Sequence, residues 1–296
     1  MIRQGWAFVQ VAFAVALATA CHDNAGLADA HNPSSKGSGS APSATQPLAQ
    51  SAAEGAGKSG VIGTSEGACA TGVLPLRKAL VTNMYTADPS AHVFGDTLYI
   101  YPSHDLEQNP ASNDNGDHYG MKDYHVLSFD RSNCSKVVDH GEVLNVKDVP
   151  WASKQMWAPD AAFKNGTYFL YFPARDKAGV FRIGVAKSAS PTGPFSAQPR
   201  PISGSYSIDP AVFVDDDGRA YMYFGGLWGG QLQNWRSGAF DAHGSAPGAD
   251  ENALGPRFAK LAADMLSFDG AVTEISIVDG EKKPLKQGDN QRRFFE

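Results

Sequence analysis

The sequence predicts an all-β fold built from a repeated unit of short strands. From residue 73 onward, aromatic and β-branched residues gather in short runs that are separated by Gly, Asn, Asp and Pro. No stretch of this region has the spacing of a long amphipathic helix. The runs recur in a common order, which indicates several similar sheets rather than one continuous sheet.

The repeated unit is a strand, a tight turn and a second strand, and it occurs three times. The copies lie at residues 87–102, 157–173 and 208–224, and their turns at Gly95-Asp96, Asn165-Gly166 and Asp217-Gly218. Asn-Gly and Asp-Gly supply the positive φ angles that a two-residue hairpin turn requires. Each copy is therefore predicted to form a β-hairpin.

Each hairpin is expected to belong to a larger sheet. The second strand of each copy is apolar on both sides, so it must be covered on both faces. Further strands are expected at residues 124–129 and 181–186, which gives units of about four strands. Such units are typical of β-propeller blades. A β-sandwich would also have short strands but would not repeat an Asp/Pro opening.

Residues 229–291 carry no signature of the unit, and Gly, Ala, Asp and Lys dominate much of this segment. It is expected to be a long insertion between the third unit and a fourth, where it could border a pocket.

The first 21 residues predict export. Arg3 precedes an apolar run from Trp6 to Leu17, which is shorter than the roughly 20 residues of a membrane-spanning helix, and a small-residue cleavage site follows. Cys21 stands where a bacterial lipoprotein carries its lipidated cysteine, although ordinary cleavage after Ala20 is the alternative. Residues 1–21 are thus read as a signal peptide, with membrane attachment through a lipid on Cys21 and location in the periplasm or at the cell surface.

Residues 22–72 are rich in Ala, Ser, Gly and Pro and predict a flexible tether, because such a segment buries too little apolar area to fold. The folded domain then spans residues 73–296. Cys69 and Cys134 are the other two cysteines, and an oxidising compartment makes a disulfide between them plausible. Two separate thiols are the alternative.

The charge of the chain argues against nucleic-acid binding. It has 25 Lys and Arg against 31 Asp and Glu, a net charge of −6, whereas nucleic-acid binders neutralise phosphates with a basic surface.

Three carboxylates stand at the openings of the units. Asp88 and Asp209 each precede a proline, whereas Asp160 follows one and is out of phase, which favours a structural role. The first strand of a propeller blade lines the central axis, so Asp88 and Asp209 are expected to converge on one funnel. Paired carboxyl groups, one protonated and one ionised, are the groups that glycoside hydrolysis requires.

The chain resembles glycoside hydrolase family 43. The matching stretches are Tyr85–Ser90, Trp157–Asp160, Ser190–Phe195 and Ile208–Phe213, and the likeness extends over residues 80–296. The family implies a five-bladed β-propeller and hydrolysis with inversion, with β-xylosidases, α-L-arabinofuranosidases and arabinanases as its usual members. The substrate implied is an oligosaccharide or polysaccharide of the hemicellulose type.

The resemblance also implies roles for three residues. Asp88 would be the general base, Asp209 would position the general acid and raise its pKa, and Glu296 would be that acid. A terminal glutamate without a catalytic role is the alternative for Glu296. Three unit signatures are visible where the family has five blades. The chain is therefore expected to be truncated at its C-terminus, and it could be inactive without the missing blades.

Other residues are candidates for contacts with the sugar. Trp157 and Trp228 could stack on a sugar face, with core packing as the alternative for both. His104-Asp105 could reach a sugar hydroxyl, with a solvated loop as the alternative. No cofactor and no catalytic metal are expected. The polar stretch from Asp105 to Asp123 could hold a structural calcium ion, although its spacing matches no calcium loop.

Two rival functions stay open. A retaining propeller enzyme resembling fructan hydrolases would normally carry Asn before its Asp-Pro, whereas Ala87 stands here. A non-catalytic, carbohydrate-binding surface lipoprotein would bind sugar without turnover.

Overall fold

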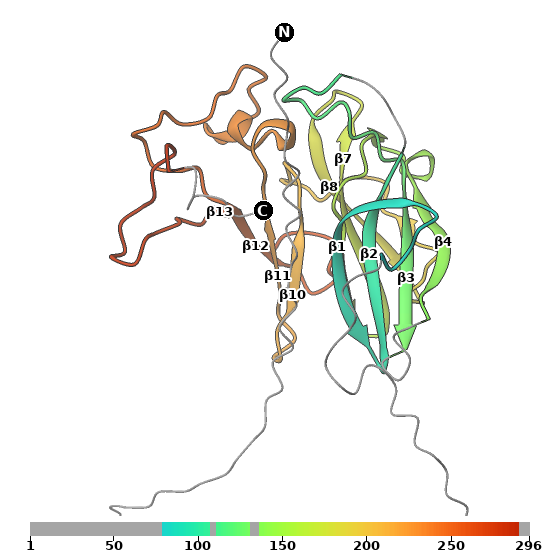
Figure 1. Ribbon diagram of the computed structural model, residues 1–296. Coiled ribbons are helices and arrows are strands. Elements are labelled where there is room, and N and C mark those ends of the chain that lie inside the picture. Colours follow the sequence, from blue (N-terminus) through green and yellow to red (C-terminus); the bar gives the residue numbers. More distant parts are fainter. Residues whose placement is uncertain (1–78, 107–110, 131–135, 290–296) are drawn as a thin grey trace, which may run out of the picture. The chain divides into compact units, whose positions relative to one another are not determined.

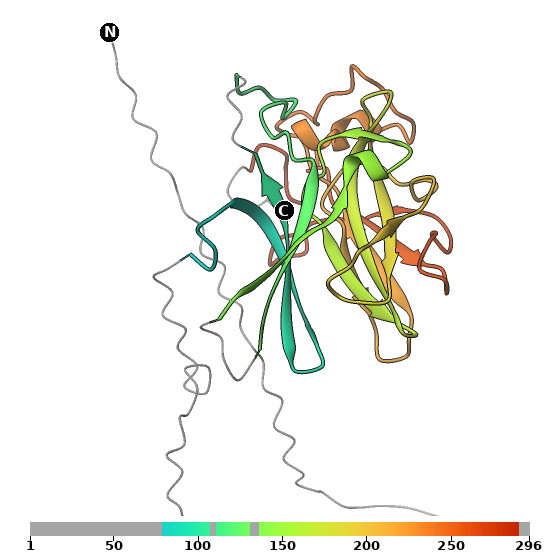
Figure 2. The ribbon, with the colours of Figure 1, turned by 90° about the vertical axis from the view of Figure 1, so that its right-hand side faces the viewer.

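The computed structural model describes residues 79–106, 111–130 and 136–289. All of these belong to one of the chain's two units, Ile62–Glu296. The signal-peptide and tether assignments, and the proposed disulfide, fall outside the described residues. Within them, thirteen strands form three antiparallel sheets. Figures 1 and 2 show this part of the chain in two views. The predicted all-β class is thereby confirmed.

The first sheet contains four strands in chain order, β1 (Tyr85–Phe94), β2 (Thr97–Asp105), β3 (Asp123–Asp130) and β4 (Val138–Asn145). The predicted turn at Gly95-Asp96 joins β1 to β2, with Phe94 opposite Thr97. Strand β3 contains the strand that was expected at residues 124–129. The register of β1 shifts between Ala87 and Ser90, where Asp88 lies.

The second sheet follows the same pattern. Its strands are β6 (Asp160–Lys164), β7 (Thr167–Asp176), β8 (Phe181–Ser188) and β9 (Ser196–Ala197), and β5 (Ala152–Lys154) pairs with the far end of β7. Asn165 and Gly166 form the β6–β7 turn with φ angles of 51° and 78°. These positive values explain why the sequence has Asn-Gly at this position.

The third sheet corrects two expectations. Its strands are β10 (Ala211–Val214), β11 (Ala220–Phe224), β12 (Arg257–Leu261) and β13 (Thr273–Glu274). The first pair is joined by five residues rather than two, with Asp217-Gly218 inside the loop. Residues 229–291 were expected to be an insertion between units, but they provide the two outer strands of this sheet.

The reason for the second error is visible in β12. Arg257, Ala259 and Leu261 are buried and alternate with half-buried residues, as expected for a strand. The strand is short, however, and a long segment separates it from β11. That segment holds the 3-10 helices η2 (Trp228–Gly230) and η3 (Leu232–Trp235); a third, η1 (Val146–Asp148), follows β4. Among the described residues, no helix has the length and apolar character needed to span a membrane.

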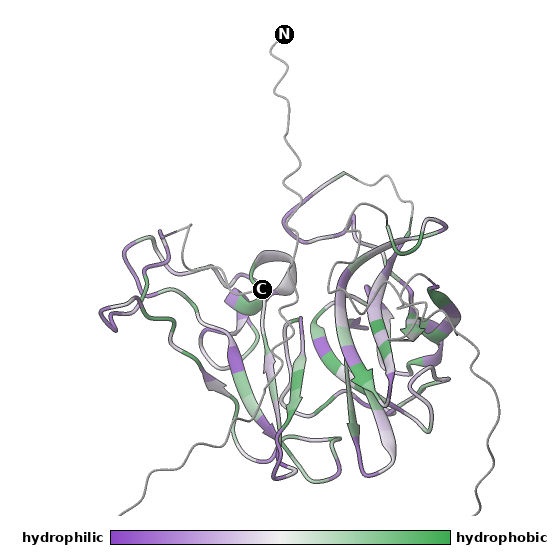
Figure 3. Ribbon diagram, turned by 60° about the horizontal axis from the view of Figure 1, so that its bottom comes forward, coloured by the Kyte–Doolittle hydropathy of each residue, from purple (hydrophilic) through white to green (hydrophobic). Residues whose placement is uncertain are grey.

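Strand β7 joins the two main hydrophobic clusters. Leu170 and Phe172 pack in a cluster with Tyr101 and Tyr124 of the first sheet. Phe169 and Tyr171, which point to the opposite face, share a cluster with residues of the third sheet, including Met222. The prediction that the second strand is covered on both faces is therefore confirmed for β7. Figure 3 shows strands with bands of both hydrophobic and hydrophilic residues.

Candidate active site

A pocket of about 410 Å³ lies where the first strands of the three sheets meet. Each sheet contributes a short segment that includes an aspartate next to a proline. The lining residues are Asp88, Pro89 and Ser90 from β1; Ala158, Pro159 and Asp160 at the start of β6; Asp209, Pro210 and Ala211 at the start of β10; and Tyr223, Phe224, Gly225 and Pro256. The structure thus brings Asp88 and Asp209 together, although they are far apart in sequence. Their catalytic roles stay predictions.

The backbone is unusual at both aspartates. Asp88 has a φ of 45° and Asp209 a φ of 58°, in the left-handed region that residues other than Gly seldom occupy. Such a conformation costs on the order of 1–3 kcal/mol and is common at functional sites. At Asp88 it coincides with the register shift in β1. Both aspartates therefore occupy local departures from regular strand geometry at the pocket.

Burial and neighbouring charges affect the acidic groups here. Burial raises the pKa of Asp88 above its usual value. Burial also raises the pKa of Asp105, the negative charge of Asp88 raises it further, and His104 opposes this effect. Tyr124 is fully buried and donates a hydrogen bond to the Trp157 carbonyl at 2.6 Å. Its pKa is raised by burial and then by the charge of Asp209.

Asp160 links the first strands of all three sheets. Its Oδ1 accepts the backbone N–H of Ala161 at 2.8 Å and lies 2.6 Å from His92 Nε2 on β1. Its Oδ2 accepts the backbone N–H of Val212 on β10 at 2.5 Å. The side chain is buried, so these bonds replace the water that the carboxylate loses. A structural role was predicted for Asp160, but its partners were not.

Ser90 provides a polar atom that the sequence did not single out. Its Oγ is buried beside the pocket and has no hydrogen-bond partner among the described residues. A buried hydroxyl without a partner is costly unless a ligand or water satisfies it. Its position two residues after Asp88 was the available signal.

The four residues predicted to contact sugar lie outside the pocket lining. Trp157 is half-buried, and its Nε1 donates to the Tyr119 carbonyl at 2.9 Å. Its ring lies 4.7 Å from that of Phe181, so packing is the contact that the structure shows. Trp228 is 50% exposed in η2. His104 and Asp105 lie at the end of β2, and the charge of Asp88 acts on the carboxyl group of Asp105.

Arg175 was missed by the sequence analysis and holds two loops near Trp157. The side chain is buried at the end of β7, and its guanidinium stacks on Phe181 at 4.7 Å. Its Nη2 donates to the Asn115 carbonyl at 2.6 Å and to the Gly229 carbonyl at 3.4 Å. A buried arginine satisfies several carbonyl groups at once, which positions both loops.

The loop that was considered for calcium is stabilised by its own side chains. Asp117 accepts hydrogen bonds from the side chains of Asn115 and Asn113 and from Lys154, and these lower its pKa to about 2. Binding of a calcium ion by this loop stays a prediction. The predicted acid, Glu296, and the cysteines Cys21, Cys69 and Cys134 lie outside the described residues.

Comparison with known proteins agrees with this arrangement. Residues 79–246 match the model of glycosyl hydrolases family 43. A xylosidase/arabinosidase 43A of Humicola insolens is 63% identical over 225 residues, which are 73% of this chain and 69% of that protein. A xylosidase/arabinosidase of Bacteroides ovatus is 50% identical over 74% of this chain and 68% of its own length.

Among solved structures, a family 43 β-xylosidase/α-arabinofuranosidase from a compost microbial metagenome, in complex with xylotriose, matches with a TM-score of 0.72 and 58% identity. The match covers 74% of this chain and 67% of that chain. The chain thus spans about two thirds of the length of these relatives. The family model and the high identity to these enzymes together show that the chain belongs to glycosyl hydrolase family 43 and is a glycosidase.

Proposed function

We propose that the protein hydrolyses terminal β-xylosyl or α-L-arabinofuranosyl residues of xylan-type oligosaccharides. The observation that carries this proposal is the convergence of Asp88 and Asp209 on one pocket from the first strands of two sheets. The substrate class is supported by the names of the relatives and by the xylotriose complex of the compost enzyme.

The mechanism proposed is a single displacement with inversion. Asp88 takes a proton from water as the water oxygen bonds to the anomeric carbon, and the bond to the leaving oxygen breaks. A pKa raised by burial suits this role, because a stronger base takes up the proton from water more readily. Ser90 Oγ, beside Asp88, is a candidate hydrogen-bond donor to that water or to the sugar.

The leaving oxygen receives its proton from Glu296 in this proposal. Asp209 would keep Glu296 protonated near neutral pH, because a nearby negative charge raises the pKa of a carboxyl group. The base and the acid of an inverting enzyme stand about 6.5–9.5 Å apart, which leaves room for the water. The roles of Asp209 and Glu296 rest on the resemblance of their motifs to the family.

The remaining parts of the proposal concern architecture and location. The three sheets would be blades of a five-bladed propeller. Residues 1–21 would direct export, and Cys21 would anchor the chain to a membrane, with residues 22–72 as the tether.

A substrate assay with product analysis tests the function. The chain and a form extended to the length of its relatives are incubated with aryl β-D-xyloside and aryl α-L-arabinofuranoside, and proton NMR records the first anomer released. Turnover with the inverted anomer is expected. Release of the retained anomer would contradict the mechanism, and binding of xylo-oligosaccharides without turnover by a folded, extended form would contradict the catalytic assignment.

The role of Asp209 has its own signature in the pH profile. In Asp209→Asn, the alkaline limb of kcat/KM is expected to move to lower pH, because the acid loses the charge that raises its pKa. An unchanged alkaline limb would show that Asp209 does not act on the acid.

A further inference from the structure

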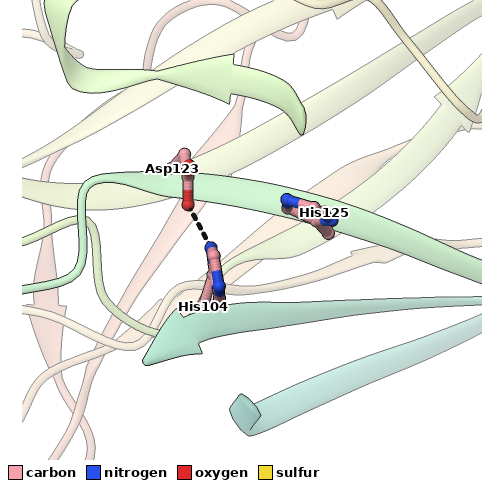
Figure 4. A group of neighbouring side chains, drawn as sticks. All are labelled: His104, Asp123 and His125. Carbon is pink, nitrogen blue, oxygen red and sulfur yellow. Dashed lines mark hydrogen bonds and ion pairs between the residues drawn. The ribbon is translucent and has the colours of Figure 1, made fainter. Parts of the chain in front are cut away.

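Two histidines and an aspartate form a cluster on one face of the first sheet. Ser103 pairs with Tyr124 in the β2–β3 ladder, which sets His104 opposite Asp123. His125 lies two residues beyond Asp123 and so points to the same face. Figure 4 shows His104 on one strand and Asp123 and His125 on its neighbour. The three side chains belong to two paired strands rather than to loops.

The cluster has the dimensions of a metal site. One donor atom from each of the three residues lies within 4.8 Å of the others. His104 Nδ1 and Asp123 Oδ1 are joined by a hydrogen bond of 2.6 Å, which would give way to bonds from these residues to the ion. The two imidazole rings have centroids 4.8 Å apart. Zinc bonds of about 2.0–2.2 Å place tetrahedral ligand atoms roughly 3.4 Å apart. Side-chain movements of about 1 Å would therefore bring these donors around one ion.

A neighbouring carboxylate orients one of the histidines. His125 Nδ1 lies 3.0 Å from Asp139 Oδ1, which also accepts the backbone N–H of Gly141 at 2.8 Å. Because an ionised carboxylate only accepts hydrogen bonds, the Nδ1 of His125 carries the proton and its Nε2 keeps the lone pair. An outer carboxylate that fixes the tautomer in this way is typical of metal-binding histidines.

The surroundings are negative and partly shielded from water. The side chains of His104, Asp123 and His125 are 20%, 15% and 16% exposed. Asp139 and Glu142 add two further carboxylates, and Lys147 lies 3.6 Å from Glu142. Partial burial strengthens the attraction between these groups and a cation.

We propose that His104, Asp123 and His125 bind one divalent transition-metal ion, with water as a further ligand. Two imidazole nitrogens and one carboxylate oxygen favour Zn²⁺ among common metal ions, since Ca²⁺ and Mg²⁺ prefer oxygen ligands throughout. The three residues are absent from the pocket lining, so the ion would join β2 to β3 rather than take part in hydrolysis. The inference thus stands apart from the proposed function, and it gives His104 a role other than the predicted sugar contact.

Cobalt provides a direct spectroscopic test. The full chain, stripped with a chelator, is titrated with Co²⁺ at neutral pH while visible absorption is recorded, and Zn²⁺ is then added as competitor. One equivalent of Co²⁺ is expected to bind and to be displaced by Zn²⁺. In His104→Gln and in His125→Gln, the affinity for Co²⁺ is expected to fall at least about tenfold. In Asp139→Asn it is expected to fall about tenfold, because Asp139 orients His125.

His140→Gln is the matched control, because His140 lies on β4 of the same sheet and contacts Ser128 at 2.7 Å. The proposal would be overturned if His104→Gln and His125→Gln bound Co²⁺ as tightly as this control. It would also be overturned if the unmodified chain did not bind one equivalent of Co²⁺. If a variant does not fold, X-ray absorption spectroscopy of the unmodified chain loaded with Zn²⁺ tests which residues bind the ion. Two imidazole ligands support the site, and a spectrum without them overturns it.

Discussion

Asp160 shows how much a single buried carboxylate contributes to the arrangement of the pocket. Its oxygens accept hydrogen bonds from one sheet on each side as well as from its own strand. The sequence indicated a structural role because Asp160 follows its proline instead of preceding it. Its partners could not be predicted, since His92 and Val212 lie 68 and 52 residues away and meet it only in the folded chain.

Asp160→Asn is expected to lower the free energy of unfolding by about 2–3 kcal/mol. An amide has one oxygen in place of two, so at least one of the three donors would face an NH₂ group. Urea unfolding followed by fluorescence measures the change. Asp96→Asn, in the exposed β1–β2 turn, is the control and should change little. Equal effects of the two substitutions would show that the bonds to Asp160 do not stabilise the assembly of the sheets.

The backbone conformations of Asp88 and Asp209 could not be predicted from the sequence either, for a different reason. Their position before proline was visible, and so was their equivalence in the repeat. Their positive φ angles were not, because proline restricts the preceding residue mainly in ψ and favours extended backbone there. Where local preference is overruled, the surrounding structure imposes the conformation, and this is frequent at functional sites.

At the scale of elements, hairpins with turn residues were predictable and outer strands were not. Gly95-Asp96 and Asn165-Gly166 mark turns by their chemistry, which acts over a few residues. Strands β12 and β13 carry no such marker, and long segments separate them from β11 and from each other. Their pairing depends on contacts that form only when the third sheet assembles.

Gly116 joins the loop after β2 to the second sheet. Its φ is +70°, and a Cβ atom there would lie 2.4 Å from Cη2 of Trp157. Gly95 has a similar φ of +62° but open space around it. Gly116→Ala is therefore expected to destabilise the fold by about 1–3 kcal/mol more than Gly95→Ala, because the first adds a steric clash to the same backbone strain.

Thermal or urea unfolding of the two alanine variants measures this difference. If Gly116→Ala and Gly95→Ala have the same free energy of unfolding, Trp157 does not pack closely on Gly116. Restored stability in the double variant Gly116→Ala, Trp157→Phe would identify the indole ring as the cause of the clash.

At the scale of the whole molecule, the stability of the fold in acid is expected to depend in part on Asp117. This residue lies in the loop after β2 and contacts Lys154 of β5, which is 37 residues away in sequence. Asp117 has a pKa of about 2 in the folded chain, against 3.8 ordinarily, because Asn115, Asn113 and Lys154 donate hydrogen bonds to it. A carboxyl group whose pKa is lower in the folded state stabilises the fold above its unfolded pKa. That contribution is lost as the pH falls from about 4 to about 2.

Asp117→Asn is accordingly expected to make the free energy of unfolding less dependent on pH between about 4 and 2. The slope of unfolding free energy against pH, compared with that of Asp96→Asn, provides the measurement. A slope identical to that of the unmodified chain would contradict the lowered pKa of Asp117.

The three sheets share one feature that determines the site: the first strand of each reaches the same pocket. The sequence predicted this from the repeat, because equivalent positions of a repeat take equivalent places in the fold. It predicted the meeting of Asp88 and Asp209, whereas Ser90, Arg175 and the partners of Asp160 emerged only from the folded chain. The five-bladed ring stays a prediction.

The central claim is that Asp88 is the base of a glycosidase pocket, and kcat/KM on the preferred aryl pentoside tests it most directly. In the form of the protein that turns over substrate, Asp88→Asn should lower kcat/KM by about 10³-fold or more. Its unfolding midpoint should not fall, because burial disfavours the charge that is removed. Asp96→Asn, in the turn between β1 and β2, should retain full activity. The claim would be contradicted if Asp88→Asn kept the kcat/KM of the unmodified protein. It would also be contradicted if the loss of activity were explained by unfolding of the variant.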